Sequence, residues 1–415
     1  MPPRRSRRSL ALVLTTALAL ALSACNPTPP EGTGGTDVEP GPFGRGIVTV
    51  NVDFQSTNVS LVALDGARLS ESFISSTSLL TGDVAAPTMP GVGDDIVLLD
   101  RGSGVVTWVD VRTAEIRAQL HADDDQLARN PWDYLPVAPD KAYVTRYDPW
   151  PGNALHGDVI IIDPTTATEL TAIDRRIDIA AALPLGGDLR VHPARGLVVG
   201  DRAYITTVLA TDAYAEYGTS YLVAIDTTTD EVTDIRELED LHDCTSIALS
   251  PSRDELAITC SGDLYANELL AQDHSAIVFL SLEDLTETDR IPASALGPGP
   301  AGFSLSYASD RALLATTFGE AAGDTDDRAY WIDLDTKDTR EIHRAAPVAI
   351  GAVLCPARLD GATDPASLTP PACFLTDAEQ GHLLRFPVED GALGSPRSIV
   401  VDEVIGLPPR YLGQF

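Results

Sequence analysis

A short apolar segment recurs along this chain, and its regular recurrence constrains the fold more than any other feature. Each copy holds five to seven residues, mostly aliphatic or aromatic, and five copies end in aspartate. The copies occupy residues 59–65, 105–110, 158–163, 221–226, 276–281, 329–333 and 382–387. The last residues of the first and seventh copies, Asp65 and Pro387, are 322 positions apart. The mean interval is therefore about 54 residues, a period typical of propellers and related repeat arrays.

The repeated segments have the composition of β-strands. They are short, rich in Val, Ile, Thr and Tyr, and bounded by turn-forming residues. A second run of this kind precedes several copies, at residues 142–146, 203–207, 255–259 and 312–316. The apolar run at 159–162 shows no alternation, as expected for a middle strand that is buried on both faces.

The repeat predicts an all-β fold, a seven-bladed β-propeller with four-stranded blades. A chain of 415 residues is too long for one ordinary core. The coils of a β-solenoid are shorter than these units, and a β-sandwich would not show seven near-equal periods. Residues 47–51 and 59–65 supply only the later strands of the first blade, while 404–407 and 411–415 follow the seventh. We therefore expect the C-terminal strand to join blade one as its innermost strand, which closes the ring and removes two exposed sheet edges.

Parts of the repeats resemble those of YVTN or YncE-type seven-bladed propellers. The segments that carry the resemblance are residues 138–145, 162–166, 225–229 and 250–259. The resemblance covers about residues 47–415 and is clearest in blades three to five, whereas in blade seven the sequence Arg-Phe-Pro at 385–387 replaces the usual Ile-Asp. Members of that family are mostly binding proteins without one shared active site. The resemblance therefore implies the fold and leaves the chemistry open.

Residues 1–24 have the composition of a secretory signal peptide. Arginines at positions 4, 5, 7 and 8 precede an apolar run from Leu10 to Leu22, and the small residues Ser23 and Ala24 follow. A retained transmembrane anchor is the alternative, but this run is short for a bilayer. Residues 6–10 also resemble a twin-arginine export signal, so both export routes stay open.

The end of this segment resembles the lipobox of bacterial lipoproteins. Residues 22–25, Leu-Ser-Ala-Cys, stand where a signal peptide is cut, and in such lipoproteins the cysteine is acylated and becomes the N-terminus. The resemblance implies that Cys25 carries the lipid and anchors the protein stably to a membrane. Asn26 stands in place of the aspartate that marks inner-membrane retention, which implies the outer membrane. Residues 25–44, rich in Pro and Gly, are then a flexible lipidated tether, and the propeller occupies 45–415.

The charge of the chain excludes nucleic acid as a partner. The chain has 61 acidic and 29 basic residues, a formal charge of −32. Removal of the signal peptide takes away four arginines and no acidic residue, which leaves 25 basic residues and a charge of −36. Such a surface repels nucleic acid and anionic lipid, and leaves cations, neutral ligands and basic protein surfaces as easier partners. A solvated acidic face without a specific partner is the alternative.

No motif in the sequence predicts a catalytic residue, a metal ligand or a cofactor. The aspartates that end the repeats fit the first position of type I turns, where the carboxylate accepts a backbone N–H. Residues 297–302 have the spacing GxGxxG, but Pro298 and Pro300 lack amide hydrogens and no helix is expected to follow. Residues 324–328 begin like a calcium loop, but Ala329 stands where glycine is required. Walker, HExxH and GxSxG sequences are absent, and the seven histidines are scattered.

Four cysteines remain in the exported chain, an even number that predicts two disulfides. Cys244 and Cys260 are 16 residues apart on adjacent strands of blade five, and Cys355 and Cys373 are 18 apart on the corresponding strands of blade seven. Adjacent antiparallel strands bring such residues within disulfide reach, so we expect the pairs Cys244–Cys260 and Cys355–Cys373. A metal pair of His242 with Cys244 is the alternative, which an oxidising compartment disfavours.

Loop lengths predict which face of the propeller carries function. The turns at 163–168, 226–231 and 250–255 are short, whereas the loops on the opposite face are longer than closure requires. These loops span 147–158, 211–220, 262–274 and 319–327, and their aromatic and charged residues are Tyr147, Trp150, His156, Tyr214, Glu216, Tyr217, Tyr265, Asp273 and His274. Aromatic side chains with carboxylates suit a protein partner, a sugar or a cationic ligand. The alternative is that the aromatics cap the blades and the loops merely vary.

Two classes of function fit these features. The sequence favours a membrane-anchored extracytoplasmic lipoprotein that binds a partner through its long loops, without catalysis. The alternative is a metal-assisted hydrolase or lyase with a site at the central channel. Three or more His, Asp or Glu side chains converging on the channel would favour the enzyme, and an apolar or aromatic lining would favour binding.

Overall fold

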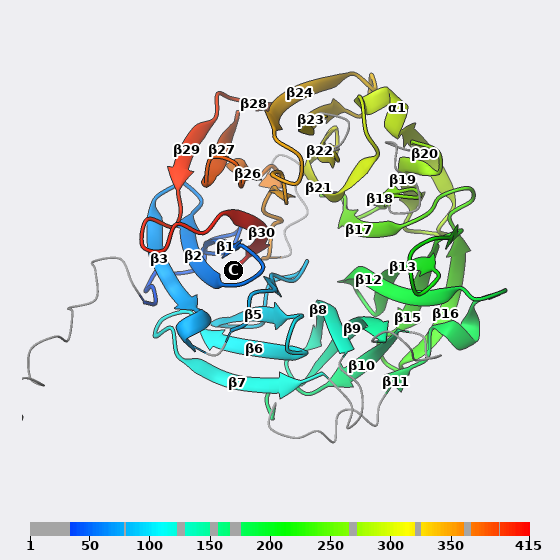
Figure 1. Ribbon diagram of the computed structural model, residues 1–415, viewed down its shortest axis with the longest axis horizontal. Helices are drawn as coiled ribbons and strands as arrows, with labels where there is room; N and C mark the ends of the chain where they lie inside the picture. The colour runs from blue at the N-terminus through cyan, green and yellow to red at the C-terminus, as the bar shows by residue number, and fades with distance from the viewer. Residues whose placement is uncertain are drawn as a thin grey trace, which may run out of the picture.

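The protein is a ring of seven antiparallel β-sheets around a common axis, as Figure 1 shows. The computed structural model describes residues 34–78, 80–122, 129–149, 157–166, 176–264, 272–319, 325–360, 367–389 and 391–415. The helical elements with defined bounds in these ranges are α1 (Ala293–Leu296) and the 3-10 turns Ser76–Ser78 and Ala180–Ala182. The predicted all-β, seven-bladed propeller is confirmed.

The four strands of each blade follow one another from the axis to the rim. The innermost strands of blades one to seven are β30 (Pro409–Gln414), β4 (Val84–Ala85), β8 (Arg129–Ala138), β12 (Arg190–Val199), β17 (Cys244–Leu249), β21 (Ala301–Ser309) and β25 (Val353–Leu354). The second strands are β1 (Gly46–Val52), β5 (Asp95–Asp100), β9 (Lys141–Pro149), β13 (Arg202–Ala210), β18 (Glu255–Ser261), β22 (Ala312–Thr317) and β26 (Ala372–Asp377).

The outer half of each blade is built in the same way. The third strands are β2 (Thr57–Ala63), β6 (Val105–Asp110), β10 (Asp158–Ile162), β15 (Tyr221–Asp226), β19 (Ser275–Ser281), β23 (Asp327–Asp333) and β27 (His382–Glu389). The outermost strands are β3 (Arg68–Ser75), β7 (Ile116–His121), β11 (Arg176–Ile177), β16 (Glu231–Glu237), β20 (Glu287–Pro292), β24 (Thr339–Ala345) and β29 (Arg397–Val400). Two short strands add to this pattern: β14 (Tyr217–Gly218) pairs with β13, and β28 (Ala392–Leu393) pairs with β27.

The repeated apolar segments of the sequence all fall on third strands, and blade packing explains their composition. In β10, Val159 and Ile161 pack towards blade four, while Ile160 and Ile162 pack towards blade two. Each of the seven blade-to-blade interfaces has its own hydrophobic cluster of this kind. A strand that is buried on both faces has no polar side to alternate with, so it appears as a continuous apolar run.

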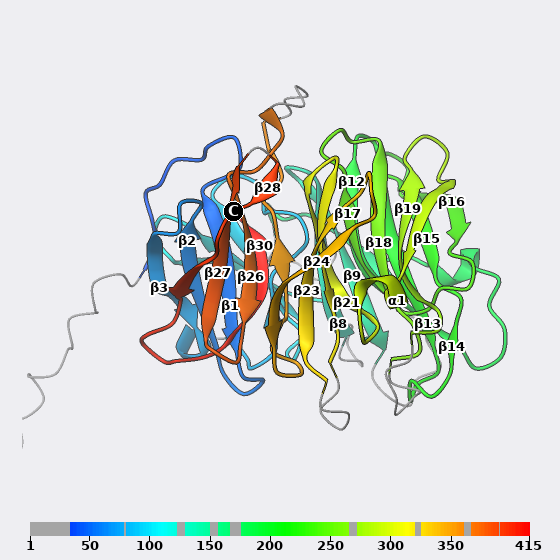
Figure 2. The ribbon, with the colours of Figure 1, turned by 90° about the horizontal axis from the view of Figure 1, so that it is seen from above.

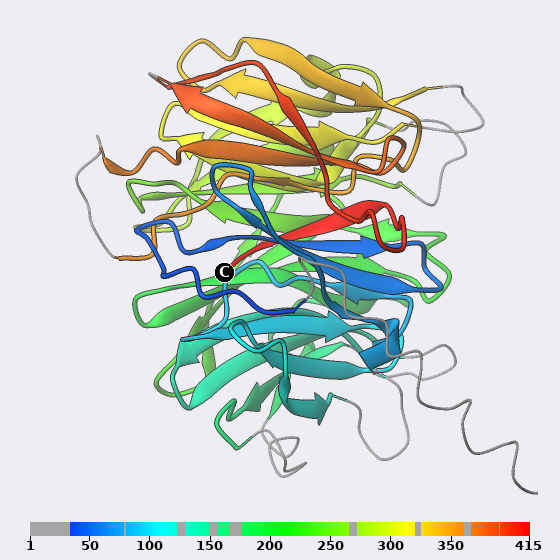
Figure 3. The ribbon, with the colours of Figure 1, turned by 90° about the vertical axis from the view of Figure 1, so that its left-hand side faces the viewer.

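The C-terminal strand closes the ring as predicted. β30 pairs antiparallel with β1, with Val48 opposite Gly413 and Val50 opposite Tyr411. Figure 3 shows this red C-terminal segment lying against the blue N-terminal strands. The apolar residues at 404–407 form no strand and belong to the connection that leads into β30. The first and last strands of the propeller, β1 and β30, therefore belong to the same sheet.

The four cysteines pair as the sequence predicts. Cys244 lies opposite Cys260 on β17 and β18, and the two form a disulfide. Cys355 follows β25 and pairs with Cys373 of β26. Two disulfides indicate that the chain folds in an oxidising, extracytoplasmic compartment. None of the helices in the described ranges is long and apolar enough to cross a membrane.

Candidate functional site

The longer loops of blades three to six emerge at one face of the ring. Each of them connects the second strand of its blade to the third, and the connections between blades emerge on the same side. Figure 2 shows the blades from the side, with their connections gathered at two opposite faces. We call the face that carries the loops 147–158, 211–220, 262–274 and 319–327 the long-loop face.

The aspartates at or just after the ends of the third strands lie at the opposite face and have the predicted turn role. The Asp163 carboxylate accepts the backbone N–H of Thr165 at 2.8 Å, and Asp226 accepts that of Thr228 at 2.8 Å. Asp65, Asp110 and Asp333 accept the N–H two residues on in the same way. Hydrogen bonds from Thr165 lower the pKa of Asp163. These carboxylates stabilise turns and do not converge on a site.

The glycine-rich segment and the calcium-like loop, which the sequence did not support as ligand sites, also have structural roles. The glycine-rich segment at 297–302 connects blades five and six, and the Gln272 amide donates to the Gly297 and Gly299 carbonyls at 2.6 and 2.7 Å. In the calcium-like loop, the buried Asp327 accepts backbone N–H groups of Gly319 and Ile350 at 2.7 and 3.0 Å. Both segments are thus held by internal hydrogen bonds.

The residues predicted for the long-loop face differ widely in exposure. Trp150, His156, Tyr265 and the lipid-site Cys25 lie outside the described residues. Glu216, Asp273 and His274 are exposed, and Tyr214 and Tyr217 are half-buried. Tyr147 lies in β9, which continues to Pro149, and is only 7% exposed. Burial accordingly raises the pKa of Tyr147 well above its ordinary value.

A row of aromatic rings runs outward from the ring axis through blades three and four. Neighbouring ring centroids are 4.4, 4.9, 5.5 and 6.3 Å apart along the sequence Trp132, Tyr147, His192, Tyr214 and Tyr217. Asp148 contacts two members of this row. Its carboxylate accepts a hydrogen bond from the Tyr214 hydroxyl at 2.8 Å and lies 2.9 Å from His192 Nδ1. This packing supports the interpretation that part of the aromatic set caps the blades.

A cavity of about 650 Å³ lies on the axis at the long-loop face. All seven blades line it, mainly through the first residues of their innermost strands, such as Trp132, Phe303 and Tyr411. Second-to-third connections add further aromatic side chains, Phe54 and Phe318. The cavity lies at this face because the innermost strands begin there, beside the connections between blades.

Three arginines line the cavity of this otherwise acidic protein. Arg101 forms an ion pair with Asp83, donates to the Tyr411 hydroxyl at 2.7 Å, and lies 4.8 Å from the Trp132 ring centroid. Arg195 donates to the Thr88 hydroxyl at 3.2 Å, and Arg410 Nε donates to the Val52 carbonyl at 3.2 Å.

The arginines at 195 and 410 carry the net charge of the cavity. Neither forms an ion pair with a carboxylate in the described ranges, although Asp133 and Asp327 lie within electrostatic reach. Burial lowers the pKa of Arg410, but an arginine stays charged at neutral pH. Among the described lining residues, Asp83 is the only carboxylate and no histidine is present.

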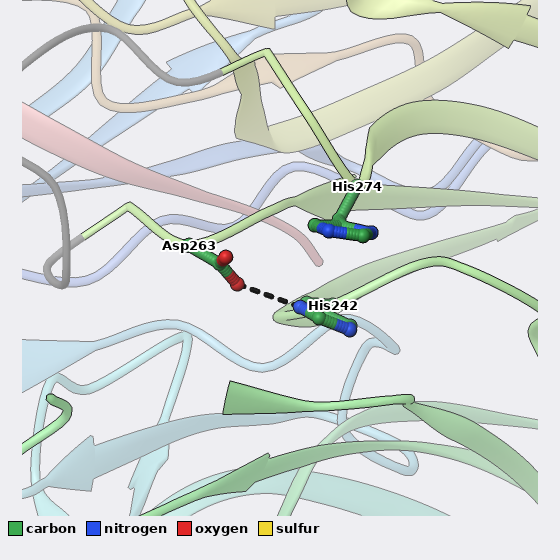
Figure 4. Close-up of side chains that lie close together, drawn as sticks. All are labelled: His242, Asp263 and His274. Atoms are coloured by element: carbon green, nitrogen blue, oxygen red, sulfur yellow. Dashed lines mark hydrogen bonds and ion pairs between the residues drawn. The ribbon is translucent and has the colours of Figure 1, made fainter. Parts of the chain in front are cut away.

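A second group of polar side chains lies on the same face in blade five. His242 Nδ1 is 2.6 Å from Asp263 Oδ1, and the rings of His242 and His274 stack with centroids 4.2 Å apart, as Figure 4 shows. Burial, with the charge of Asp263 nearby, raises the pKa of the adjacent Asp243 to about 7. The sequence analysis placed His274 on this face and weighed His242 as a ligand beside Cys244, but it did not bring His242, Asp263 and His274 together.

Solved structures share the fold with this chain at very low sequence identity. The periplasmic gluconolactonase of Pseudomonas aeruginosa aligns over 89% of this chain and 98% of its own, with a TM-score of 0.54 and 11% identity. A candidate 6-phosphogluconolactonase from Bacteroides uniformis aligns over 89% and 99%, with a TM-score of 0.55 and 10% identity. A hypothetical selenium-binding protein from Sulfolobus tokodaii aligns over 91% and 96%, with a TM-score of 0.55 and 9% identity. No family model matches the sequence, and no curated protein matches it either. These similarities show the propeller fold alone.

Proposed function

We propose that this protein is an exported, lipid-anchored binding protein whose propeller takes a small anionic ligand into the axial cavity. The observation that carries the proposal is the pair Arg195 and Arg410, two cavity arginines without an ion-pair partner in the described chain. A guanidinium is a strong, geometrically specific donor to carboxylate or phosphate oxygens. The surrounding aromatic rings supply apolar surface against which a sugar or aromatic ring of the ligand packs.

The lining of the cavity favours binding over catalysis. Metal-assisted hydrolysis or elimination needs several His, Asp or Glu side chains around one point. Among the described cavity residues only Asp83 is of this kind, and Arg101 occupies it. The long-loop face outside the cavity remains a predicted docking surface for a protein, a sugar or a cationic ligand, because its side chains are acidic and aromatic. The three arginines line only the cavity at its centre.

A second candidate is a metal-assisted hydrolase or lyase. The observation in its favour is the group His242, Asp263 and His274 at the same face, next to the cavity-lining Leu264. The Pseudomonas aeruginosa protein of the same fold is named a gluconolactonase, so in that protein the fold carries a lactonase activity. Turnover of a bound ester or lactone would favour this candidate over a binding protein.

We expect the cavity to discriminate by charge between ligands of the same shape. Titration of the soluble propeller with gluconate and benzoate should give stronger binding than titration with the neutral analogues glucitol and benzyl alcohol. Arg195→Gln and Arg410→Gln should each weaken anion binding about 10- to 100-fold, because each removes a charge-assisted hydrogen bond of about 1.5–3 kcal/mol. Arg290→Gln, on the outer strand of blade five, is the matched control and should bind as the wild type does. Equal responses to the charged and neutral probes would contradict the proposal.

Lipid attachment predicts a clear change of compartment on substitution of one residue. The wild-type protein should fractionate with membranes and incorporate labelled fatty acid, whereas Cys25→Ala should do neither, since no thiol is left to acylate. Asn26→Asp is the control, which keeps the lipid and should move the protein to the inner membrane. Membrane association and electrophoretic mobility that do not change in Cys25→Ala would refute the anchor.

A further inference from the structure

Three side chains from separate connections of blade five meet at the long-loop face. His242 precedes β17, Asp263 follows β18, and His274 directly precedes β19. One potential ligand atom from each residue lies within 4.8 Å of the other two. We propose that these residues, which we call the His242 cluster, bind one divalent transition-metal ion, with zinc as the best fit.

The tautomer of His274 suits metal binding. Its Nδ1 lies 3.1 Å from the backbone carbonyl of Asp240. A carbonyl only accepts hydrogen bonds, so Nδ1 carries the proton and the lone pair of the neutral ring is on Nε2. Metal-binding histidines are oriented in this way by a hydrogen bond from the nitrogen that does not bind the metal.

The ends of the strands that carry the cluster are tied together by covalent and hydrogen bonds. The disulfide Cys244–Cys260 joins β17 to β18 two residues after His242 and three before Asp263. The His242 N–H donates to the His274 carbonyl at 3.1 Å, and the Gly262 N–H donates to the His242 carbonyl at 3.0 Å. The backbone therefore holds the three side chains near one another before any ion binds, which reduces the entropy cost of forming the site.

Metal binding requires the hydrogen bond between His242 Nδ1 and Asp263 Oδ1 to open and the His274 ring to turn. The rings of His242 and His274 are parallel to within 15°, and a nitrogen lone pair lies in the plane of its ring, so the stacked rings do not aim at one point. Figure 4 shows the two rings one above the other, with Asp263 facing His242. Tetrahedral zinc with bonds of about 2.0–2.2 Å places its ligand atoms about 3.4 Å apart. His274 is exposed, so its ring is able to turn and close the remaining gap.

The donor set selects among metals. Two imidazoles and one carboxylate suit zinc, nickel or copper, whereas magnesium and calcium take oxygen ligands. The nearest thiols are unavailable, since Cys244 and Cys260 are bonded to each other. Three protein ligands leave one coordination position open. Asp263 forms no ion pair with an arginine or lysine of the described chain, and on binding the ion takes the place of the proton that His242 Nδ1 shares with Asp263 Oδ1.

The test is direct titration of metal into tag-free, chelator-treated protein with its disulfides intact. Zinc chloride should bind at one ion per chain, and magnesium chloride should not compete. His242→Ala, Asp263→Asn and His274→Ala should each weaken zinc binding at least 10-fold. His121→Ala, which removes an exposed histidine of β7, is the matched control and should leave zinc binding unchanged.

A second measurement separates loss of ligands from loss of fold. His274 is exposed, so His274→Ala should keep the wild-type circular dichroism and disulfide content while it loses zinc. Cobalt bound to the wild type should show the visible absorption of a tetrahedral nitrogen–oxygen site, and His274→Ala should not show it. Absence of saturable zinc binding, or zinc binding that His274→Ala and Asp263→Asn leave intact, would overturn the proposal. These outcomes are independent of anion binding in the cavity, which is tested by its own variants.

Discussion

Replacement of Arg146 by methionine is expected to lower the free energy of unfolding by about 3–5 kcal/mol, the cost of breaking a buried ion pair. The Arg146 side chain is fully buried and binds Asp158 with two nitrogens, Nε at 2.5 Å from Oδ1 and Nη2 beside Oδ2. Its Nη1 donates to the Ala122 carbonyl at 2.8 Å. The substitution leaves a largely buried carboxylate whose remaining ion-pair partner in the described part of the chain is Arg176, at 3.8 Å. Because this pair joins β9 to β10 at the base of a long loop, its loss also loosens the long-loop face.

Urea unfolding followed by circular dichroism measures the effect, and the chain offers a matched control. Arg290 and Glu287 form a two-nitrogen pair of similar geometry, but their side chains are each 30% exposed. Arg290→Met should therefore cost no more than about 1 kcal/mol. The double variant Arg146→Met/Asp158→Leu should recover much of the loss, because it leaves no buried charge unpaired. Equal costs for Arg146→Met and Arg290→Met would contradict this account of the pair.

The sequence predicted those strands whose burial produces a regular pattern of apolar residues. Third strands such as β10 are buried on both faces, so they appear as apolar runs at a regular interval. The outermost strand β16 alternates irregularly between exposed and half-buried residues, and the innermost strands β4 and β25 have only two residues each. These strands are defined by backbone pairing with a neighbouring strand. Backbone pairing has little effect on amino-acid composition, so the sequence does not reveal these strands.

The cavity could not be predicted from the same patterns. Its residues come singly or in short runs from all seven blades, so no local motif marks them. The formal charge of −36 for the chain without its signal peptide also gave no sign that Arg195 and Arg410 line the cavity. Local charge near the axis, and not the average over the chain, decides which ion is attracted there.

The His242 cluster was within reach of sequence reasoning. The predicted disulfide placed Cys244 beside Cys260, and His242 and Asp263 lie two and three residues beyond these cysteines at the same end of the hairpin. His274 lies two residues before the repeated segment of blade five, so it belongs to that end as well. The histidines look scattered only by distance along the chain. β17 and β19 both pair with β18, so the connections that precede them lie at the same end of the blade and bring His242 and His274, 32 positions apart, into contact.

Deletion of residues 409–415 is expected to remove most or all of the stability of the propeller. These residues form the innermost strand of blade one, and their loss exposes the edge of β1. Leu412 packs in the interface with blade seven and Phe415 in the interface with blade two, so two hydrophobic clusters lose a member. Each large buried side chain contributes about 2–5 kcal/mol, against a total stability of about 5–15 kcal/mol for a typical protein. The truncated chain should accumulate as insoluble or protease-sensitive material, while Leu412→Ala alone should fold with a lower Tm.

A circular permutant separates the need for this strand from the need for its position in the chain. The Gly46 N–H donates to the Phe415 carbonyl at 3.2 Å, so a loop of two to five residues can join β30 directly to β1 as a hairpin. New termini between Glu403 and Val404 lie in the exposed connection before β30. This permutant should unfold at nearly the wild-type urea concentration, because it keeps every strand pair of the closed ring. A truncated chain as stable as the wild type would show that β30 is dispensable, and a permutant as unstable as the truncation would show that pairing alone does not close the ring.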